Sequence, residues 1–242
     1  MDERGAPNFK RKLKQMASEK IYDNNIVIKP WGYEYVLYRN SNKLCITYLN
    51  INPGQSTSLH SHIYKKTGFL IIGGKARIQL GLYKTNQQSF TAPSKLMIRP
   101  GLFHSIKNIG KKTLKCLEFE SPSGKQDLIR YEDNYGRSNK KYEGKKYLKK
   151  FEKPFMFNKF KKNFVQSILI EDIKINIKSV KNLKLRKNTK TIYSLIEGKI
   201  VNNFNKNVMP LGDLIKTGTI RKILKRFKIK NYATFIEVYK NK

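Results

Sequence analysis

The residues best suited to chemistry are the three histidines of the chain, His60, His62 and His104. His60-Ser61-His62 follows the turn residues Pro53-Gly54 in a strand-like run. Residues two apart on a strand project to the same face. Imidazole is a good ligand for iron, nickel, zinc and copper. The spacing predicts half of a metal site, which His104 would complete if the fold brings it to the same place.

The segment that must position these histidines reads as an all-β domain. From Ile26 onward, short runs rich in Val, Ile, Tyr and Phe alternate with Gly, Pro, Asn and Ser. Many short strands at regular spacing predict an antiparallel β-sandwich or barrel over residues 26–120. The expected strands are Tyr33–Tyr38, Leu44–Asn50, Gly68–Ile72, Ala76–Tyr83, Lys95–Ile98, Ser105–Ile109 and Leu114–Glu120.

The second half echoes the first. The run Phe69–Lys75 resembles Tyr193–Lys199, and two further pairs of runs recur at a similar offset of roughly 120 residues. We therefore predict a second, degenerate β-barrel half over residues 164–242, with Gly198 and Gly218 in turns equivalent to those of Gly74 and Gly101. The expected strands are Phe164–Ile170, Ile173–Ile177, Ile192–Ile196, Lys199–Phe204, Asp213–Lys216 and Thr234–Tyr239. This half contains no histidine and has Arg221 where His104 would recur, so it is not expected to hold a metal.

Two other segments differ in composition from the β regions. Residues 1–25 form a basic N-terminal arm in which a short amphipathic helix is expected. Residues 121–163 are polar and contain Gly124, Gly136, Gly144 and Pro154, which predicts a linker or wrapping segment. The longest apolar run is Phe69–Ile72, too short for a membrane span, and the charged N-terminus lacks the apolar core of a secretory signal.

Charge and cysteine content restrict the function classes. Lys and Arg number 51 against 17 Asp and Glu, a net charge of +34. The lysines are spread over both halves, and the richness in Lys, Asn and Ile matches a coding bias, so a nucleic-acid partner is unexpected. Attraction of an anionic small molecule is compatible with this charge. Two cysteines, Cys45 and Cys116, in strand-like runs predict a pair of buried, reduced thiols in a cytoplasmic protein.

The histidine motifs resemble those of the cupin superfamily. Gly54, His60, His62 and Gly74 follow the order of the first cupin motif, and the run Arg99–Asn108, with His104 inside it, is similar to the second. The resemblance implies a double-stranded β-helix whose motif histidines point inward. It also implies that His60, His62 and His104 are the ligands of a divalent metal ion, which could be Fe, Mn, Zn, Ni or Co.

One position departs from the family pattern. The first motif usually carries a glutamate ligand five residues after its second histidine, and this chain has Thr67 there. Three explanations stay open. The site could be a neutral three-histidine site, another carboxylate such as Glu118 or Glu120 could replace the missing ligand, or the metal could have been lost.

Two further runs resemble particular groups within the cupin superfamily. Lys29–Glu34 is similar to the entry motif of cupins in mannose-6-phosphate isomerases of the guanylyltransferase-linked type. The run Asp127–Arg137 is similar to the tail of cupins found with nucleotide-sugar and capsule synthesis. This resemblance implies a role in carbohydrate metabolism or polysaccharide biosynthesis.

The leading hypothesis is a metal-dependent isomerase or epimerase of a sugar phosphate or nucleotide sugar. The alternatives are an Fe(II) cupin oxygenase or lyase and a non-catalytic sugar-binding cupin. A homodimer is compatible with each. The candidate catalytic residues are Glu118, Tyr48 and Tyr64, and the candidate substrate-binding residues are Lys65, Lys66 and Arg99.

Overall fold

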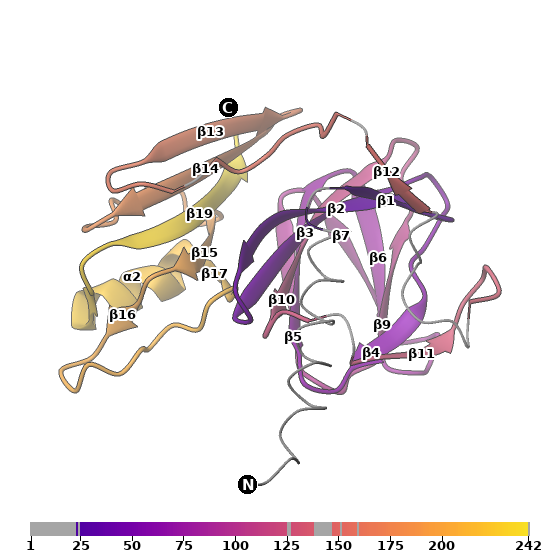
Figure 1. Ribbon diagram of the computed structural model, residues 1–242, viewed down its shortest axis with the longest axis horizontal. Helices are drawn as coiled ribbons and strands as arrows, with labels where there is room; N and C mark the ends of the chain where they lie inside the picture. The colour runs from indigo at the N-terminus through magenta and orange to yellow at the C-terminus, as the bar shows by residue number, and fades with distance from the viewer. Residues whose placement is uncertain are drawn as a thin grey trace, which may run out of the picture.

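The computed structural model describes residues 23, 25–124, 127–137, 147–150, 152–158 and 160–241. Almost all of the predicted basic arm, residues 1–25, therefore lies outside the described residues. The described part is mainly β, as predicted, with one helix in the second half, α2 (Thr217–Arg226) (Figure 1). No helix in these ranges is long and apolar enough to cross a membrane.

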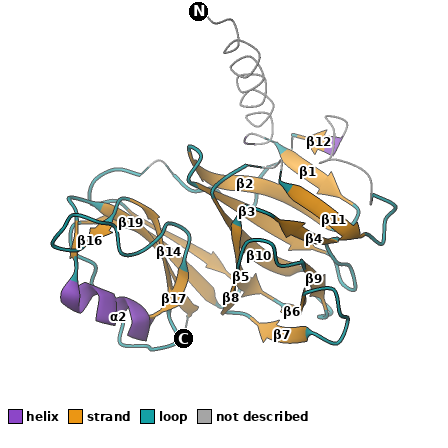
Figure 2. Ribbon diagram, turned by 90° about the horizontal axis from the view of Figure 1, so that it is seen from below, coloured by secondary structure: helices purple, strands orange, loops and turns teal. Residues whose placement is uncertain are grey.

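The first half of the chain forms two antiparallel sheets that face each other (Figure 2). Within the described residues, sheet A has seven strands in the order β12-β1-β2-β3-β10-β5-β8, and sheet B has five in the order β11-β4-β9-β6-β7. The strands are β1 (Ile26–Lys29), β2 (Gly32–Asn40), β3 (Leu44–Ile51), β4 (Leu59–His62), β5 (Lys66–Gly73), β6 (Lys75–Leu80), β7 (Gln87–Thr91), β8 (Ser94–Ile98), β9 (His104–Asn108), β10 (Leu114–Ser121), β11 (Leu128–Glu132) and β12 (Leu148–Lys149).

The inner faces of sheets A and B enclose an apolar core. Successive residues of a strand point to opposite faces, so each strand contributes every second side chain to this core. On β5, Phe69 and Ile71 point inward, whereas Leu70 and Ile72 point outward. Both sets are buried because both faces of sheet A are covered. This pair of facing sheets is the double-stranded β-helix predicted from the sequence.

The second half repeats part of this topology. In the described ranges, sheet C has the order β13-β14-β19-β15-β17, and β16 pairs with β18. The same order appears in sheet A as β2-β3-β10-β5-β8, and β16–β18 corresponds to the β6–β9 pair of sheet B. The strands are β13 (Val165–Ile170), β14 (Ile173–Val180), β15 (Ile192–Glu197), β16 (Ile200–Val201), β17 (Leu214–Lys216), β18 (Lys228–Ile229) and β19 (Ala233–Lys240).

A shared irregularity supports the repeat. The β10–β5 ladder skips Ile72, and the β19–β15 ladder skips Ile196. Each skipped residue lies two positions before a glycine with a φ of +84°, Gly74 and Gly198. The equivalence predicted for these two glycines is therefore confirmed by the backbone.

The predicted repeat is wrong at its other glycine. Gly218 lies in α2, whereas Gly101 occupies a turn with a φ of +78°. Apolar residues at a helical spacing, Ile220, Ile223 and Leu224, pack this helix into the core of the second half. Arg221 is also helical and is not a strand counterpart of His104.

Sheets A and C pack on each other through their outer faces (Figure 1). Leu70 and Leu117 from sheet A belong to the same buried cluster as Ile175 and Ile236 from sheet C. The second half thus covers the face of sheet A that points away from the histidines.

The segment 121–163 contains strands that the sequence analysis missed. β11 pairs with β4 and β12 pairs with β1, so the segment extends both sheets of the first half. Phe155 and Phe160 from the same segment pack against the core between sheets A and C. The division into residues 26–120, 121–163 and 164–242 stays a prediction.

Candidate metal centre

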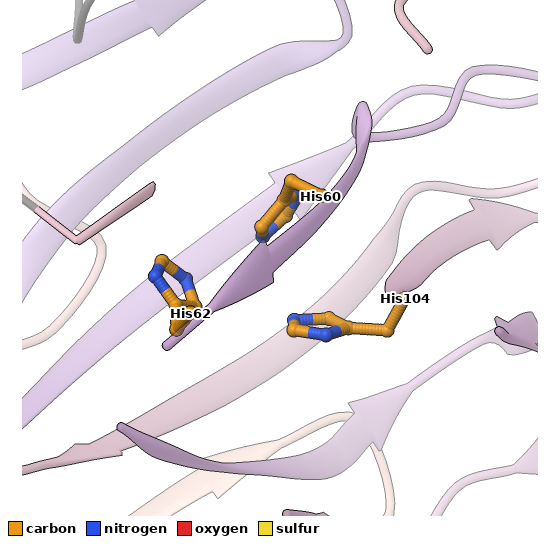
Figure 3. Close-up of side chains that lie close together, drawn as sticks. All are labelled: His60, His62 and His104. Carbon is orange, nitrogen blue, oxygen red and sulfur yellow. The ribbon is translucent and has the colours of Figure 1, made fainter. Parts of the chain in front are cut away.

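Two neighbouring strands of sheet B bring the three histidines together (Figure 3). His60 on β4 lies directly opposite His104 on β9, and His62 lies two residues further along β4. The ring centroids are 4.6 Å apart for His60 and His104, 5.2 Å for His60 and His62, and 5.9 Å for His62 and His104. One nitrogen from each ring lies within 4.8 Å of the other two.

Hydrogen bonds orient all three rings. Nδ1 of His60 lies 2.8 Å from the carbonyl oxygen of Ser58, and Nδ1 of His104 lies 2.9 Å from that of Leu102. Nδ1 of His62 lies 3.2 Å from Oδ1 of Asp127. An acceptor at Nδ1 fixes the proton there and leaves the Nε2 lone pair for a metal, the usual arrangement around metal-binding histidines.

The remaining nitrogens suit a cation. Nε2 of His104 is buried and has no hydrogen-bond partner among the residues described. Such a group is costly to bury without a partner, and a divalent ion would supply one. The three side chains therefore fit the metal that the sequence motifs imply.

Burial keeps two of the imidazoles neutral. Burial, together with the nearby His104 and His62 rings, holds the pKa of His60 well below its usual range. Burial also lowers the pKa of His104 to about 4. Neutral imidazole is the form that binds metal, so near neutral pH these two rings need not lose a proton first.

Charged side chains line the pocket beside the histidines. Trp31 and Phe69 supply apolar wall, and four cations surround the same space: Lys29, Lys65, Arg130 and Arg137. Carboxylates are also present, and the acidic residues of the lining are Glu34, Glu118 and Glu120.

A buried ionic cluster adjoins His62. Nζ of Lys65 lies 2.6 Å from Oε1 of Glu120 and 3.2 Å from Oδ1 of Asp127. Burial alone would raise the pKa of Asp127, but the hydrogen bond from His62, the charge of Lys65 and the N–H of Tyr64 outweigh it and lower this pKa to about 2. The carboxylate behind His62 is therefore ionised at neutral pH.

Two of the six other predicted site residues lie at this pocket. Glu118 is on the inner face of β10 and lines the pocket, as does Lys65. Lys65 is only 3% exposed and is engaged by acidic residues.

The structure does not bring the remaining four to the pocket. Tyr48 points to the outer face of sheet A, where its ring packs on Tyr35 and Phe155, because it is one residue out of phase with the inner-facing Thr47. Tyr64 is 73% exposed. Lys66 points outward and pairs with Asp213 of the second half. Arg99 is exposed in the turn before His104 and is not part of the lining.

Sequence reasoning missed the arginines of the pocket. Arg130 lies on β11, and its Nε donates to Oγ of Ser58 at 3.2 Å while its Nη1 donates to the carbonyl of Arg137 at 2.9 Å. Arg137 is itself held by Asp133, at 2.6 Å between Nη2 and Oδ1. The available signal was the alternation of Leu128, Arg130 and Glu132 with Ile129 and Tyr131.

Comparisons with known proteins agree with the sequence motifs. Residues 16–133 match the family described as "Mannose-6-phosphate isomerase C-terminal". The chain is 31% identical over 117 residues to the xanthan biosynthesis protein XanB of Xanthomonas campestris, covering 46% of this chain and 24% of that protein. It is 28% identical over 131 residues to a mannose-1-phosphate guanylyltransferase of Klebsiella pneumoniae, covering 52% of this chain and 26% of that protein. The chain thus spans about a quarter of the length of these relatives.

A solved structure was also matched. It is the capsular polysaccharide assembling protein CapF from Staphylococcus aureus, with a TM-score of 0.41, 16% identity and coverage of 45% of this chain and 32% of that chain. Residues 16–133 are therefore similar to mannose-6-phosphate isomerase C-terminal domains, in agreement with the resemblance to cupins that the histidine motifs carry.

Proposed function

We propose that the chain is a divalent-metal-dependent enzyme that acts on a sugar phosphate or a nucleotide sugar, as an isomerase or epimerase. One observation carries the proposal. Three buried imidazoles, each oriented through Nδ1, converge on one another, and two of them, His60 and His62, line a pocket whose wall also holds four cationic side chains. The names of the relatives, which include a mannose-1-phosphate guanylyltransferase, support the class of substrate.

His60, His62 and His104 would hold the metal ion. A bound divalent ion supplies Lewis-acid chemistry, which polarises a carbonyl and stabilises negative charge on its oxygen. The chain's contribution is to fix the three rings in advance through Ser58, Leu102 and Asp127. Preorganised ligands avoid the cost of ordering the site when the metal or substrate binds.

Arg130 and Arg137 are suited to the anionic part of the substrate. A guanidinium presents several N–H donors in a plane that matches phosphate oxygens. Contacts with Ser58 and the backbone of Arg137 fix the direction of the Arg130 fork. We assign phosphate or diphosphate binding to this pair.

Glu118 is the carboxylate that we assign as the base. It lies on the inner face of β10 and lines the same pocket as His60 and His62. An aldose–ketose interconversion or an epimerisation moves a proton at a carbon next to a carbonyl, and a carboxylate in reach of that carbon can accept it. Tyr48 and Tyr64, placed outside the pocket, are withdrawn from this role.

Solvent exchange at the substrate carbon tests the proposal. Protein stripped of metal and reloaded with Mn, Zn, Co, Ni or Fe is incubated in D₂O with a panel of phosphorylated sugars, and NMR follows deuterium entering next to the carbonyl. We expect metal-dependent exchange that Glu118→Gln reduces by about 10²-fold or more. The matched control is Glu132→Gln on β11, a substitution of the same kind outside the lining of this pocket.

Other outcomes would replace the proposal. Oxygen uptake with bound iron and no exchange would favour the oxygenase or lyase. Sugar binding with neither metal nor exchange would favour a non-catalytic binding protein.

A further inference from the structure

A carboxylate lies beside the three histidines, on a different sheet. Oε1 of Glu120 is 3.7 Å from Nε2 of His62, the ring nitrogen that is not engaged by Asp127. Two ligand atoms bound to one divalent ion at about 2.1 Å each are typically separated by roughly 3 to 3.5 Å. The Glu120 oxygen is thus near the separation expected of two ligands of one ion, although in this structure it lies outside the group of mutually close ligand atoms that His60, His62 and His104 form.

The position of Glu120 is fixed by the strand register. Glu120 on β10 is the direct cross-strand partner of Thr67 on β5, so both side chains point to the inner face of sheet A. Directly paired residues have Cβ atoms about 4.5–5.5 Å apart. Thr67 is 1% exposed, and its hydroxyl has no hydrogen-bond partner in the described part of the chain. A carboxylate moved from position 120 to position 67 would therefore still point towards the histidines from the inner face of sheet A.

Lys65 explains how Glu120 is tolerated before a metal binds. Glu120 is 3% exposed, and an ionised carboxylate at that depth needs a compensating charge. Nζ of Lys65 provides it at 2.6 Å. The ammonium also lies near Asp127, the hydrogen-bond partner of His62.

We propose that Glu120 is the fourth protein ligand of the metal and that Lys65 holds its carboxylate until the ion enters. Position 67 then needs no carboxylate, because Glu120 on the neighbouring strand supplies the ligand, and Thr67 is a neutral residue of the inner face. The proposal rests on the metal site of the proposed function. It adds one anionic oxygen to three neutral nitrogens, which lowers the net charge of a divalent site from +2 to +1.

Cobalt(II) titration of metal-free protein tests this assignment, because its visible absorption reports the ligand set independently of activity. Glu120→Gln should weaken Co(II) binding by about 10- to 100-fold or more and change the absorption bands of the saturated protein. Glu118→Gln is the matched control, since it neutralises a carboxylate two residues away on the same face of β10. It should leave the bands unchanged.

Two further variants should raise Co(II) affinity, the first relative to Glu120→Gln and the second relative to wild type. Glu120→Gln combined with Thr67→Glu should restore much of the lost affinity, because the carboxylate returns from the paired strand position. Lys65→Met should tighten Co(II) binding by roughly 10-fold, because it removes a positive charge close to the incoming ion. Circular dichroism confirms that each variant is folded before titration.

The outcomes separate this inference from the proposed function. If wild type binds no Co(II), the metal site itself is absent and both fail. If wild type binds Co(II) and Glu120→Gln has the same bands and an affinity within twofold, only the ligand assignment is overturned. An equal loss in Glu118→Gln would also overturn it, because the effect would then be a general one of pocket charge.

Discussion

His60, His62 and His104 each contribute one imidazole to the candidate metal centre, so each single removal leaves two nitrogens. His60→Ala, His62→Ala and His104→Ala should each weaken metal retention by at least about 100-fold, measured by elemental analysis after dialysis. Ser61→Ala is the matched control, because Ser61 lies between two of the histidines and faces the other side of β4. Retention of a full equivalent of metal in any histidine variant would contradict the assignment.

Residue types and spacing identify the three histidines but not all of their surroundings. The order of His60, His62 and His104 in two short motifs is visible in the sequence, and so is the unusual Thr67. The face of the sheet to which Tyr48 points is not visible in the sequence. It depends on the phase of β3, because a shift of one residue exchanges the two faces of a strand. The contact between His62 and Asp127 spans 65 positions and needs the packed fold.

At the scale of elements, the two glycines for which the repeat predicted turns, Gly198 and Gly218, lie in different backbone settings, and substitutions can distinguish these settings. A Cβ added at Gly198 would meet the carbonyl oxygen of Tyr232 at 2.5 Å and Cα of Ala233 at 2.8 Å, and its φ is +84°. Gly198→Ala should therefore lower the free energy of unfolding by at least about 2 kcal/mol.

Gly218 is the matched control for that substitution. It is helical, and nothing lies within 4 Å of an added Cβ. Gly218→Ala should raise the free energy of unfolding by about 0.4–1 kcal/mol, measured by chemical denaturation. If it were strongly destabilising, the turn predicted from the sequence would be right and the helix wrong.

The inner face of sheet C carries a buried polar pair whose ionisation should make the stability of the fold depend on pH. Tyr193 is paired across strands with Glu237, and its hydroxyl donates to Oε1 of Glu237 at 3.4 Å. Burial, reinforced by this carboxylate, raises the pKa of Tyr193 from 10.0 to about 12. The folded state thus holds this proton more tightly than the unfolded state, so its contribution to stability is complete below pH 10 and is lost as the pH rises towards 12.

Unfolding measured across that window checks the prediction. The free energy of unfolding of wild type should fall more steeply between pH 10 and 12 than that of Tyr193→Phe, which has no hydroxyl to ionise. Equal slopes would mean that Tyr193 titrates as an exposed tyrosine does.

Strand prediction succeeded for runs rich in apolar residues, whose faces are mostly buried, and failed where polar or charged residues dominate the strand. The strands of sheets A and C with buried faces, such as β10 and β19, were located within a few residues. β7 (Gln87–Thr91) was missed because four of its five residues are polar and exposed. β11 was assigned to a linker because Arg130 and Glu132 do not resemble a buried face, although Arg130 points into the pocket. Its strand character follows from pairing with β4, which local sequence does not encode.

For the whole molecule, the shared core between sheets A and C should make the two halves unfold together. The chain has one tryptophan, Trp31, which is buried in the first half and reports on that half alone. Ile236→Ala removes buried apolar volume from the second half's side of the core and should cost about 2–5 kcal/mol. It should move the Trp31 fluorescence transition and the far-UV circular dichroism transition to the same lower denaturant concentration.

Leu169→Ala, at a residue that is 61% exposed, is the control and should shift neither transition by much. Independent halves would behave differently. Ile236→Ala would then lower part of the dichroism transition and leave the Trp31 transition in place.

The proposed metal centre requires that His60, His62 and His104 together bind one divalent metal ion. Crystals of the protein grown with Co(II), with diffraction data collected on both sides of the cobalt absorption edge, test it most directly. We expect an anomalous peak inside the first half, at about 2.1 Å from the Nε2 atoms of all three histidines. A well-ordered site without that peak, or cobalt bound only elsewhere on the protein, would contradict the metal centre and the function proposed from it.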